Sequence, residues 1–139
     1  MTEPEAHVLV VAHRTAASPR LIDAVRRRTQ QGPCRVTLLV PRPYWDPDTE
    51  EAELVVELAV PVLEDAAGRH VDAIIGESDP VGAVRQVLAA TQVDEIIVST
   101  LPQRVSHWLR RDVPSLIERL GLPVTVVTAE QSSRQLKAT

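Results

Sequence analysis

Charged and hydroxyl-bearing residues gather in three short segments of this 139-residue chain, and the first and third of these segments contain the cations. The first is His13-Arg14-Thr15, the second is Gly-Glu-Ser-Asp at 76–79, and the third runs from Ser99 to Asp112. Arginine offers a fixed fork of N–H donors that suits carboxylate or phosphate, and hydroxyls add neutral donors. These residue types favour binding of a small anion over bond-making chemistry. The candidate ligand-binding residues are His13, Arg14, Thr15, Gly76, Ser99, Thr100, Arg104, His107, Arg110 and Arg111.

Two interpretations of the third segment remain open. Its arginines and His107 fall within eight residues that include no lysine, which suits a compact anion. Alternatively, they are surface residues, or they pair with Asp79 and Asp112 and leave no room for a ligand.

Enzyme signatures are absent from the sequence. It contains no GxxxxGK[ST], GxGxxG, GxSxG or HExxH, and no paired Cys–His pattern for a metal. His13 and His107 could meet near Ser99, but a histidine at a strand end is more often a hydrogen-bonded structural residue. We therefore expect a protein that is not an enzyme and holds no metal or cofactor.

The elements that must position these residues are visible as short apolar runs rich in β-branched residues. Their near-continuous apolar character is typical of strands buried on both faces. Helical spacing fills the gaps, so we predict an α/β domain with a five-stranded, mostly parallel, doubly wound sheet in the order 3-2-1-4-5 and helices on both faces. The predicted strands are His7–Ala12, Arg35–Val40, Val71–Ile75, Asp94–Ser99 and Val124–Thr128.

This strand order places a crevice between the carboxyl ends of the first and fourth strands, where ligands bind in such folds. We expect helices to open at Ser18-Pro19, at Asp79-Pro80 and near Asp112. The carboxylates of Asp79 and Asp112 should cap their helices and occupy the N–H groups that a phosphate would use. The sequence therefore disfavours a polyphosphate there.

The second helix should begin near Asp48 or Thr49 and bend or break within a turn of Pro61. Seven apolar residues with helical spacing should form its buried face. They are Leu54, Val55, Leu58, Ala59, Val62, Leu63 and Ala66.

Composition limits the location and the partners. A net charge of −4 argues against general nucleic-acid binding, and no run of 18 apolar residues predicts a membrane span. The start of the sequence does not resemble a signal peptide, and the single cysteine, Cys34, suits a reducing, cytoplasmic location. We expect one domain over residues 1–139, in which 130–139 form a flexible tail.

From the third predicted strand onward, the chain resembles the universal stress protein family. The resemblance rests on Gly76-Glu77-Ser78-Asp79-Pro80, on Asp94 before an apolar strand, and on the last strand led by Pro123. With Val8–Ser18 it spans nearly the whole chain. It implies a nucleotide-binding α/β fold, a role in the stress response, and homodimers joined through Val124–Thr128.

Members that bind ATP carry G-x2-G-x9-G-[ST] after the fourth strand. In this chain the corresponding positions are Ser99, Pro102, Asp112 and Val113, so none of the three glycines is present. The family's aspartate near the end of the first strand falls near His13. The resemblance therefore implies a divergent member that does not bind ATP in the usual mode.

Two functions follow as expectations. The first is a binding or regulatory domain for a small anionic or nucleotide-derived ligand in the crevice beyond strands 1 and 4. The second is a ligand-free, dimeric protein-interaction module in which side chains fill a degenerate nucleotide site.

Overall fold

The computed structural model describes residues 5–42, 50–102 and 106–129. Within these ranges, five parallel strands form one sheet in the order β3-β2-β1-β4-β5, so the predicted fold class and strand order are confirmed. The strand bounds differ from the predicted ones by at most one residue. The strands are β1 (Ala6–Val11), β2 (Cys34–Pro41), β3 (Val71–Gly76), β4 (Glu95–Thr100) and β5 (Val124–Thr128).

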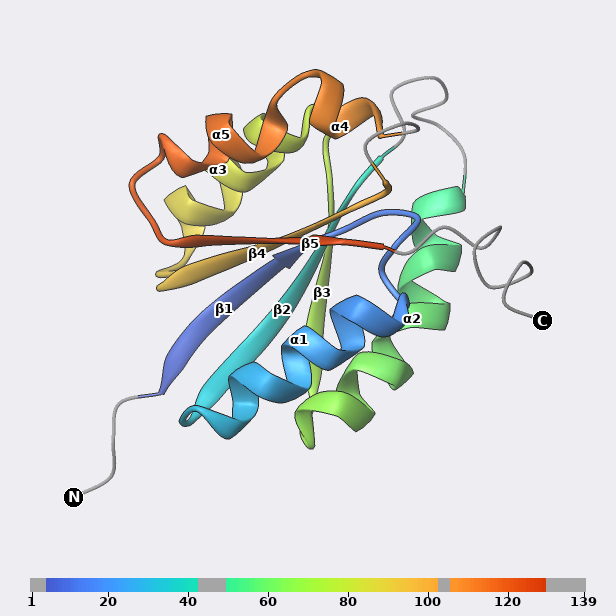
Figure 1. Cartoon of the computed structure of the whole chain (residues 1–139), viewed down its shortest axis with the longest axis vertical. Coiled ribbons are helices and arrows are strands. Elements are labelled where there is room, and N and C mark those ends of the chain that lie inside the picture. The colour runs from blue at the N-terminus through green and yellow to red at the C-terminus, as the bar shows by residue number, and fades with distance from the viewer. Residues whose placement is uncertain (1–4, 43–49, 103–105, 130–139) are drawn as a thin grey trace.

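Helices cover both faces of the sheet (Figure 1). The helices α1 (Pro19–Gln30) and α2 (Glu51–Ala67) pack on one face. The opposite face carries α3 (Pro80–Ala90), the single turn α4 (His107–Arg110) and α5 (Val113–Glu118). None of the helices in the described ranges is long and apolar enough to cross a membrane.

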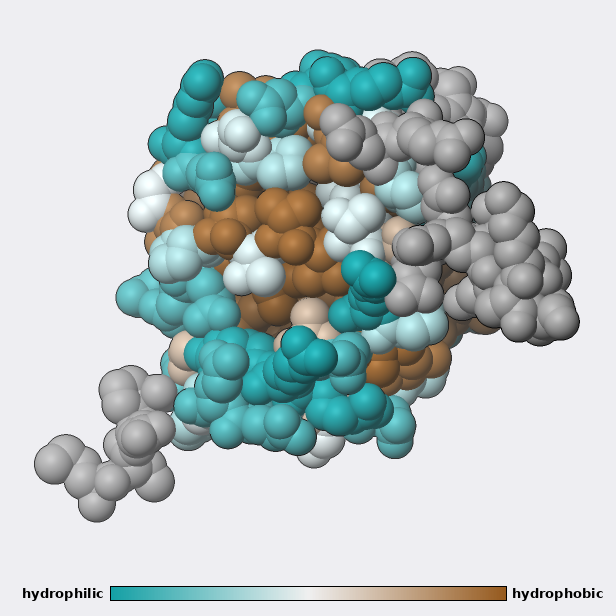
Figure 2. All heavy atoms as spheres, viewed as in Figure 1, coloured by the Kyte–Doolittle hydropathy of each residue, from teal (hydrophilic) through white to brown (hydrophobic). Residues whose placement is uncertain are grey.

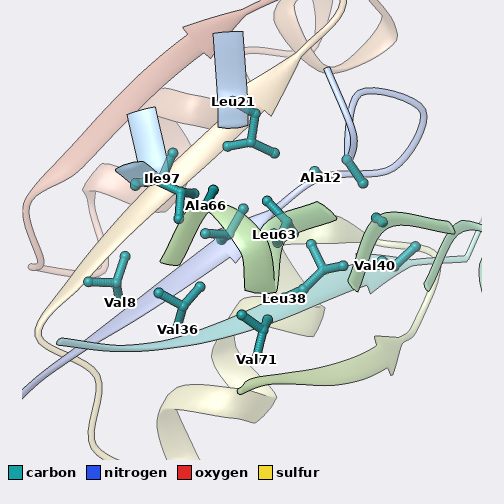
Figure 3. Close-up of a cluster of buried hydrophobic side chains, with 14 of the residues drawn as sticks. Val8, Ala12, Leu21, Val36, Leu38, Val40, Leu63, Ala66, Val71 and Ile97 are labelled. Carbon is teal, nitrogen blue, oxygen red and sulfur yellow. The ribbon is translucent and has the colours of Figure 1, made fainter. Parts of the chain in front are cut away.

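Two apolar cores sandwich the sheet. Along β1, Val8 and Val10 enter the core under α1 and α2, whereas Leu9 and Val11 enter the core under α3 and α5. Figure 3 shows the first of these cores, where Leu63 of α2 lies against the sheet. Burial of both faces explains why the strands read as continuous apolar runs.

The helix α1 begins as the sequence predicts. Ser18 Oγ accepts the N–H of Leu21 at 3.3 Å, and Pro19 occupies the first helical position. Near the end of α1, the side chain of Arg28 is mostly buried, and its Nε donates a hydrogen bond to Glu95 Oε1 at 2.8 Å. Arg28 therefore ties α1 to the start of β4.

The sequence predicts that α2 bends or breaks near Pro61, and the structure shows that the helix does not break there. The helix is continuous from Glu51 to Ala67, and its axis changes direction near its middle in Figure 1. Proline has no N–H, so one helical bond is lost there, but the buried side chains on both sides of it hold the two halves on the sheet.

The predicted buried face of α2 is partly wrong. Ala59, Leu63 and Ala66 are buried as expected. Leu54 and Leu58 are exposed, and about a third of the Val62 side chain is exposed as well. The helix is apolar around most of its circumference, so spacing alone cannot tell which stripe meets the sheet.

The capping prediction at Asp79 and Asp112 is also wrong. Both residues occupy the N-cap position of their helices, α3 and α5, but neither side chain makes a capping hydrogen bond. Two predictions fall outside the described residues: the ligand-binding role of Arg104 and the flexible tail at 130–139.

Candidate functional site

The loop after β1 meets the end of β4 at the carboxyl edge of the sheet, where the strand order reverses. Thr15 Oγ1 lies 2.6 Å from Ser99 Oγ, and both residues are buried. Two of the predicted ligand-binding residues, Thr15 and Ser99, are therefore in direct contact. This hydrogen bond fixes the loop that carries His13 and Arg14.

Thr100 adds a hydroxyl of a different kind. It is the last residue of β4 and only 2% exposed, yet its Oγ1 has no hydrogen-bond partner in the part of the chain that the structure describes. Buried polar groups are satisfied in the great majority of cases, and an unsatisfied one costs about 1–3 kcal/mol. A donor or acceptor supplied by a ligand would remove that cost.

Glu51, in the first turn of α2, lies beside the predicted cations. Its Oε1 is 3.8 Å from His13 Nε2 and 3.9 Å from Arg14 Nε. Burial lowers the pKa of His13 below its usual 6.5; the Glu51 carboxylate opposes this shift, and the Arg14 charge adds to it. His13 is therefore neutral at physiological pH, and Arg14 faces a carboxylate.

A second ion pair joins the residue after β2 to the first turn of α2. Arg42, which follows β2, places its guanidinium 3.0 Å from Glu53 Oε1. Two carboxylates of α2 thus face the two arginines that follow β1 and β2. These two carboxylates offset the charges of Arg14 and Arg42, so this side of the site attracts an anion less strongly than His13 and Arg14 alone would predict.

Gly76 has a packing role. It ends β3, and a Cβ built on it would lie 2.7 Å from Ala83 Cβ of α3 and 3.1 Å from Leu39 Cδ1. A glycine is needed there for α3 to approach the sheet. This contact accounts for Gly76 without a ligand.

Carboxylates still crowd the start of α3, although not by capping. A Cβ built on Gly82 would collide with Glu77 Oε1 and lie 3.3 Å from Asp79 Oδ2. Glu77 also accepts a hydrogen bond from Gln86 at 2.7 Å. Phosphate remains disfavoured at this helix end, because two negative side chains lie against its first turn.

The third segment is only partly described. Ser106 is buried and its Oγ accepts the N–H of Leu109 at 3.0 Å, so it begins α4 rather than serving as a free donor. Arg110 and Arg111 are exposed, and Arg110 Nε donates to the Ser106 carbonyl at 3.4 Å. Arg104 and the side chain of His107 lie outside what the structure describes.

Asp112 has an unusual backbone. Its φ of 58° and ψ of 37° place it in the left-handed region, and no other non-glycine residue in the described ranges has a positive φ. Glycine adopts this conformation at no steric cost, whereas other residues pay for it. Asp112 is the position at which the family resemblance places a glycine.

An open groove of about 500 Å³ lies elsewhere, between α1 and β5. Its walls include Arg20 and Arg27 from α1 and Thr125 and Val126 from the edge strand. Figure 2 shows apolar surface at the centre of this view, between polar borders. Val126 is 43% exposed, so the free edge of the sheet presents an apolar side chain to solvent.

Sequence reasoning missed Glu51. Acidic residues are common in the first turn of a helix, where they interact favourably with its dipole, so Glu51 has an ordinary explanation. Only the folded chain shows that its carboxylate reaches the loop after β1. Among the described residues, no group of three or more His, Cys, Asp and Glu side chains could hold a metal ion.

Several solved structures of universal stress proteins share this fold. The universal stress protein from Archaeoglobus fulgidus aligns with a TM-score of 0.64 at 14% identity. The alignment covers 88% of this chain and 93% of that protein. A universal stress protein in complex with cAMP aligns with a TM-score of 0.64 at 15% identity. That alignment covers 92% of this chain and 100% of the other. A universal stress protein family protein from Arabidopsis thaliana with AMP bound aligns with a TM-score of 0.60 at 12% identity. The alignment covers 92% of this chain and 94% of that protein.

These likenesses show that the chain has the universal stress protein fold, as the resemblance implied. No protein-family model matches the sequence, and a comparison with curated proteins finds no match.

Proposed function

We propose that this chain is a non-enzymatic binding domain that holds a small, nucleotide-derived ligand at the carboxyl edge between β1 and β4. The observation that carries the proposal is the buried hydroxyl of Thr100 at the carboxyl end of β4, which has no hydrogen-bond partner among the described residues. The preceding residue, Ser99, is bonded to Thr15 of the loop after β1. Polar groups without partners are rare in folded cores and call for an explanation. A ligand with hydrogen-bonding groups supplies one.

The place of these hydroxyls supports the same function. They lie at the reversal of strand order, where doubly wound sheets bind their ligands. Structures with this fold have been solved in complex with cAMP and with AMP. We carry that ligand class to this chain as part of the proposal.

The proposed ligand is not ATP in the family's usual mode. Ser99, Pro102 and Asp112 stand where ATP-binding members have glycines, and proline removes one backbone donor. Glu77 and Asp79 lie against the first turn of α3 and would repel a polyphosphate. No cofactor is part of the proposed function.

The arginine-rich third segment has a smaller part in the proposal than the sequence suggests. Arg110 and Arg111 are exposed, so they can approach a ligand only from the rim. Exposed arginines contribute mainly to the rate of association and little to affinity. The buried hydroxyls are the stronger candidates for direct contacts.

A second candidate function is a ligand-free interaction module. It is favoured by Glu51, which already lies beside His13 and Arg14 and partly fills the site. Both candidates include a homodimer joined through β5, whose free edge exposes Val126. We also infer a cytoplasmic location, because Cys34 is a buried free thiol and the sequence contains no second cysteine that could form a disulfide with it.

A thermal-shift screen separates the two candidates. Nucleosides, nucleoside monophosphates, cyclic nucleotides, ATP and inorganic phosphate are each added at several millimolar, with chloride at equal ionic strength as the control. Binding to the folded state raises the melting temperature by mass action. A specific rise with at least one nucleoside or nucleotide supports the binding domain, and no rise beyond chloride with any of them supports the interaction module.

A further inference from the structure

We infer that the solvent-facing side of α2 is a docking surface for a partner protein, and that its occupant is an amphipathic helix whose apolar stripe is bordered by basic residues. The inference goes beyond the proposed binding function and does not depend on its ligand. The docking surface consists of two adjacent rows of exposed side chains, each repeating every four residues along α2. The apolar row is Leu54, Leu58 and Val62, and the acidic row is Glu53, Glu57 and Asp65, with Pro61 between the last two.

The apolar row faces solvent. Leu54 is 56% exposed, Leu58 73% and Val62 36%, whereas Ala59 and Leu63 of the same helix are buried in the core under α2. Among the described residues, five large hydrophobic side chains are exposed, and three of them form this row. Helix propensity does not require them, because glutamate, lysine and arginine favour a helix about as well as leucine. Apolar side chains gathered on one exposed face are typical of a protein interaction site.

The spacing of the two rows favours a helix as the occupant. Residues four apart on a helix form a ridge, and two such ridges border a groove into which a ridge of a second helix packs. At a rise of about 1.5 Å per residue, the ridge from Leu54 to Val62 extends about 12 Å, or roughly two turns. A helix in this groove would place apolar side chains on Leu58 and the side chains beside them on Glu57.

Charge favours a basic partner over a second copy of this chain. The helix α2 carries five acidic residues and no basic one. Glu53 is paired with Arg42, whereas Glu57 and Asp65 are exposed and make no ion pair with another described residue. If two α2 helices packed together, every charge that one helix presented to the other would be negative. Lysine or arginine beside the apolar stripe of a partner would instead meet these carboxylates.

The docking surface is separate from the other candidate surfaces of the molecule. The helix α2 packs over β2 and β3, and β3 forms the sheet edge opposite β5 (Figure 1). A homodimer joined through β5 would therefore leave both rows of α2 accessible. An anionic membrane is a poor match for them, because helices that bind such membranes carry lysine and arginine on their polar side.

The test titrates fluorescent peptides of about 18 residues with the full chain and follows their anisotropy. The probe peptide has leucine at helical spacing with lysine and arginine on both sides of the leucine stripe. One control peptide has the same composition in scrambled order, and a second has glutamate in place of each basic residue. We expect the probe to bind with a dissociation constant of about 10–100 μM, as suits an interface below the standard size, and both controls to bind at least about tenfold more weakly.

Matched pairs of variants locate the peptide on the protein. Leu58→Ser should weaken binding about fivefold or more, because it removes the most exposed side chain of the apolar row. Val126→Ser is its control, because it truncates an exposed apolar residue of β5 and should bind the probe as wild type does. Glu57→Gln should weaken binding and reduce its salt dependence, whereas Glu118→Gln, at an exposed position on α5, should change neither. Circular dichroism confirms that all four variants fold.

Four results would overturn the inference. Wild-type protein that does not bind the probe has no such docking surface, and equal binding of a control peptide contradicts the requirement for a basic amphipathic helix. An unchanged affinity in Leu58→Ser places the peptide away from α2. A lower mass of Leu58→Ser than of wild type in light scattering at about 100 μM, above typical dissociation constants of specific dimers, shows that a second copy occupies α2. Ligand binding is measured separately by the thermal-shift screen.

Discussion

Thr15 Oγ1 lies 2.6 Å from Ser99 Oγ, although 84 residues separate the two in the chain. The contact joins the loop after β1 to the end of β4, and both side chains are shielded from water. The groups proposed to bind a ligand therefore belong to one fixed arrangement of neighbouring strands rather than to two independent loops.

The first prediction concerns the contribution of this hydrogen bond to the free energy of unfolding. Ser99→Ala should lower the free energy of unfolding by about 1–3 kcal/mol, because it leaves the Thr15 hydroxyl buried without a partner. The double variant Thr15→Val/Ser99→Ala should cost less than the sum of the two single changes, since no orphaned hydroxyl remains. Urea denaturation of the four proteins gives the coupling energy, and additive losses within about 0.3 kcal/mol would show that the pair does not interact.

The second prediction concerns the left-handed backbone of Asp112. Asp112→Val should lower stability by about 1–2 kcal/mol, because a β-branched side chain fits this conformation poorly. Asp112→Gly should leave stability unchanged or raise it, since glycine adopts a positive φ without strain. Equal stability losses in the two variants would contradict the backbone argument and point to a contact of the carboxylate instead.

The third prediction concerns pH. Burial lowers the pKa of His13 in the folded protein below the usual 6.5, so the unfolded chain binds a proton more readily. Stability should therefore fall as the pH drops from 6.5 toward the lowered pKa, and this contribution should level off below that pKa. His13→Gln should flatten this part of the stability profile.

Glu51 supplies a check on that assignment. Its charge raises the pKa of His13 against the effect of burial, so Glu51→Gln should lower that pKa further. The acid loss of stability should then extend over a wider pH range than in wild type. A narrower range in Glu51→Gln, or an unchanged profile in His13→Gln, would show that another group controls this transition.

The fourth prediction tests the proposed dimer. Val126 is exposed on the edge strand β5, and Val126→Arg should convert a dimer into a monomer by placing a charge in the interface. Leu58→Arg is the control, because it changes an even more exposed apolar residue on α2, away from β5. Light scattering at about 100 μM, above typical dissociation constants of specific dimers, measures both. A monomeric wild type at that concentration would refute the dimer.

Much of the fold can be predicted from local pattern. The strands are recognisable because both faces of the sheet are buried, and this makes segments such as Arg35–Val40 apolar throughout. Ser18 and Pro19 predict the start of α1, because capping depends on a few neighbouring residues. The strand order follows from the rules for parallel crossovers.

The errors arise where the result depends on residues distant in sequence. Leu58 and Leu63 are alike in type, and only the position of α2 on the sheet buries Leu63 and exposes Leu58. Asp79 has the sequence of a cap, yet its side chain makes no capping bond. Glu51 looks like an ordinary residue of a first helical turn until the fold brings it to His13.

The binding function itself is tested most directly by calorimetric titration of nucleosides and monophosphates into wild-type protein and Thr100→Val. The substitution removes the buried hydroxyl that lacks a partner, so the unliganded variant should be as stable as wild type or more stable. We expect at least one of these compounds to bind wild type, and Thr100→Val to bind it about tenfold more weakly, which corresponds to the loss of one hydrogen bond. Equal affinity of the two proteins for that compound, or no binding by wild type, would contradict the proposed binding function.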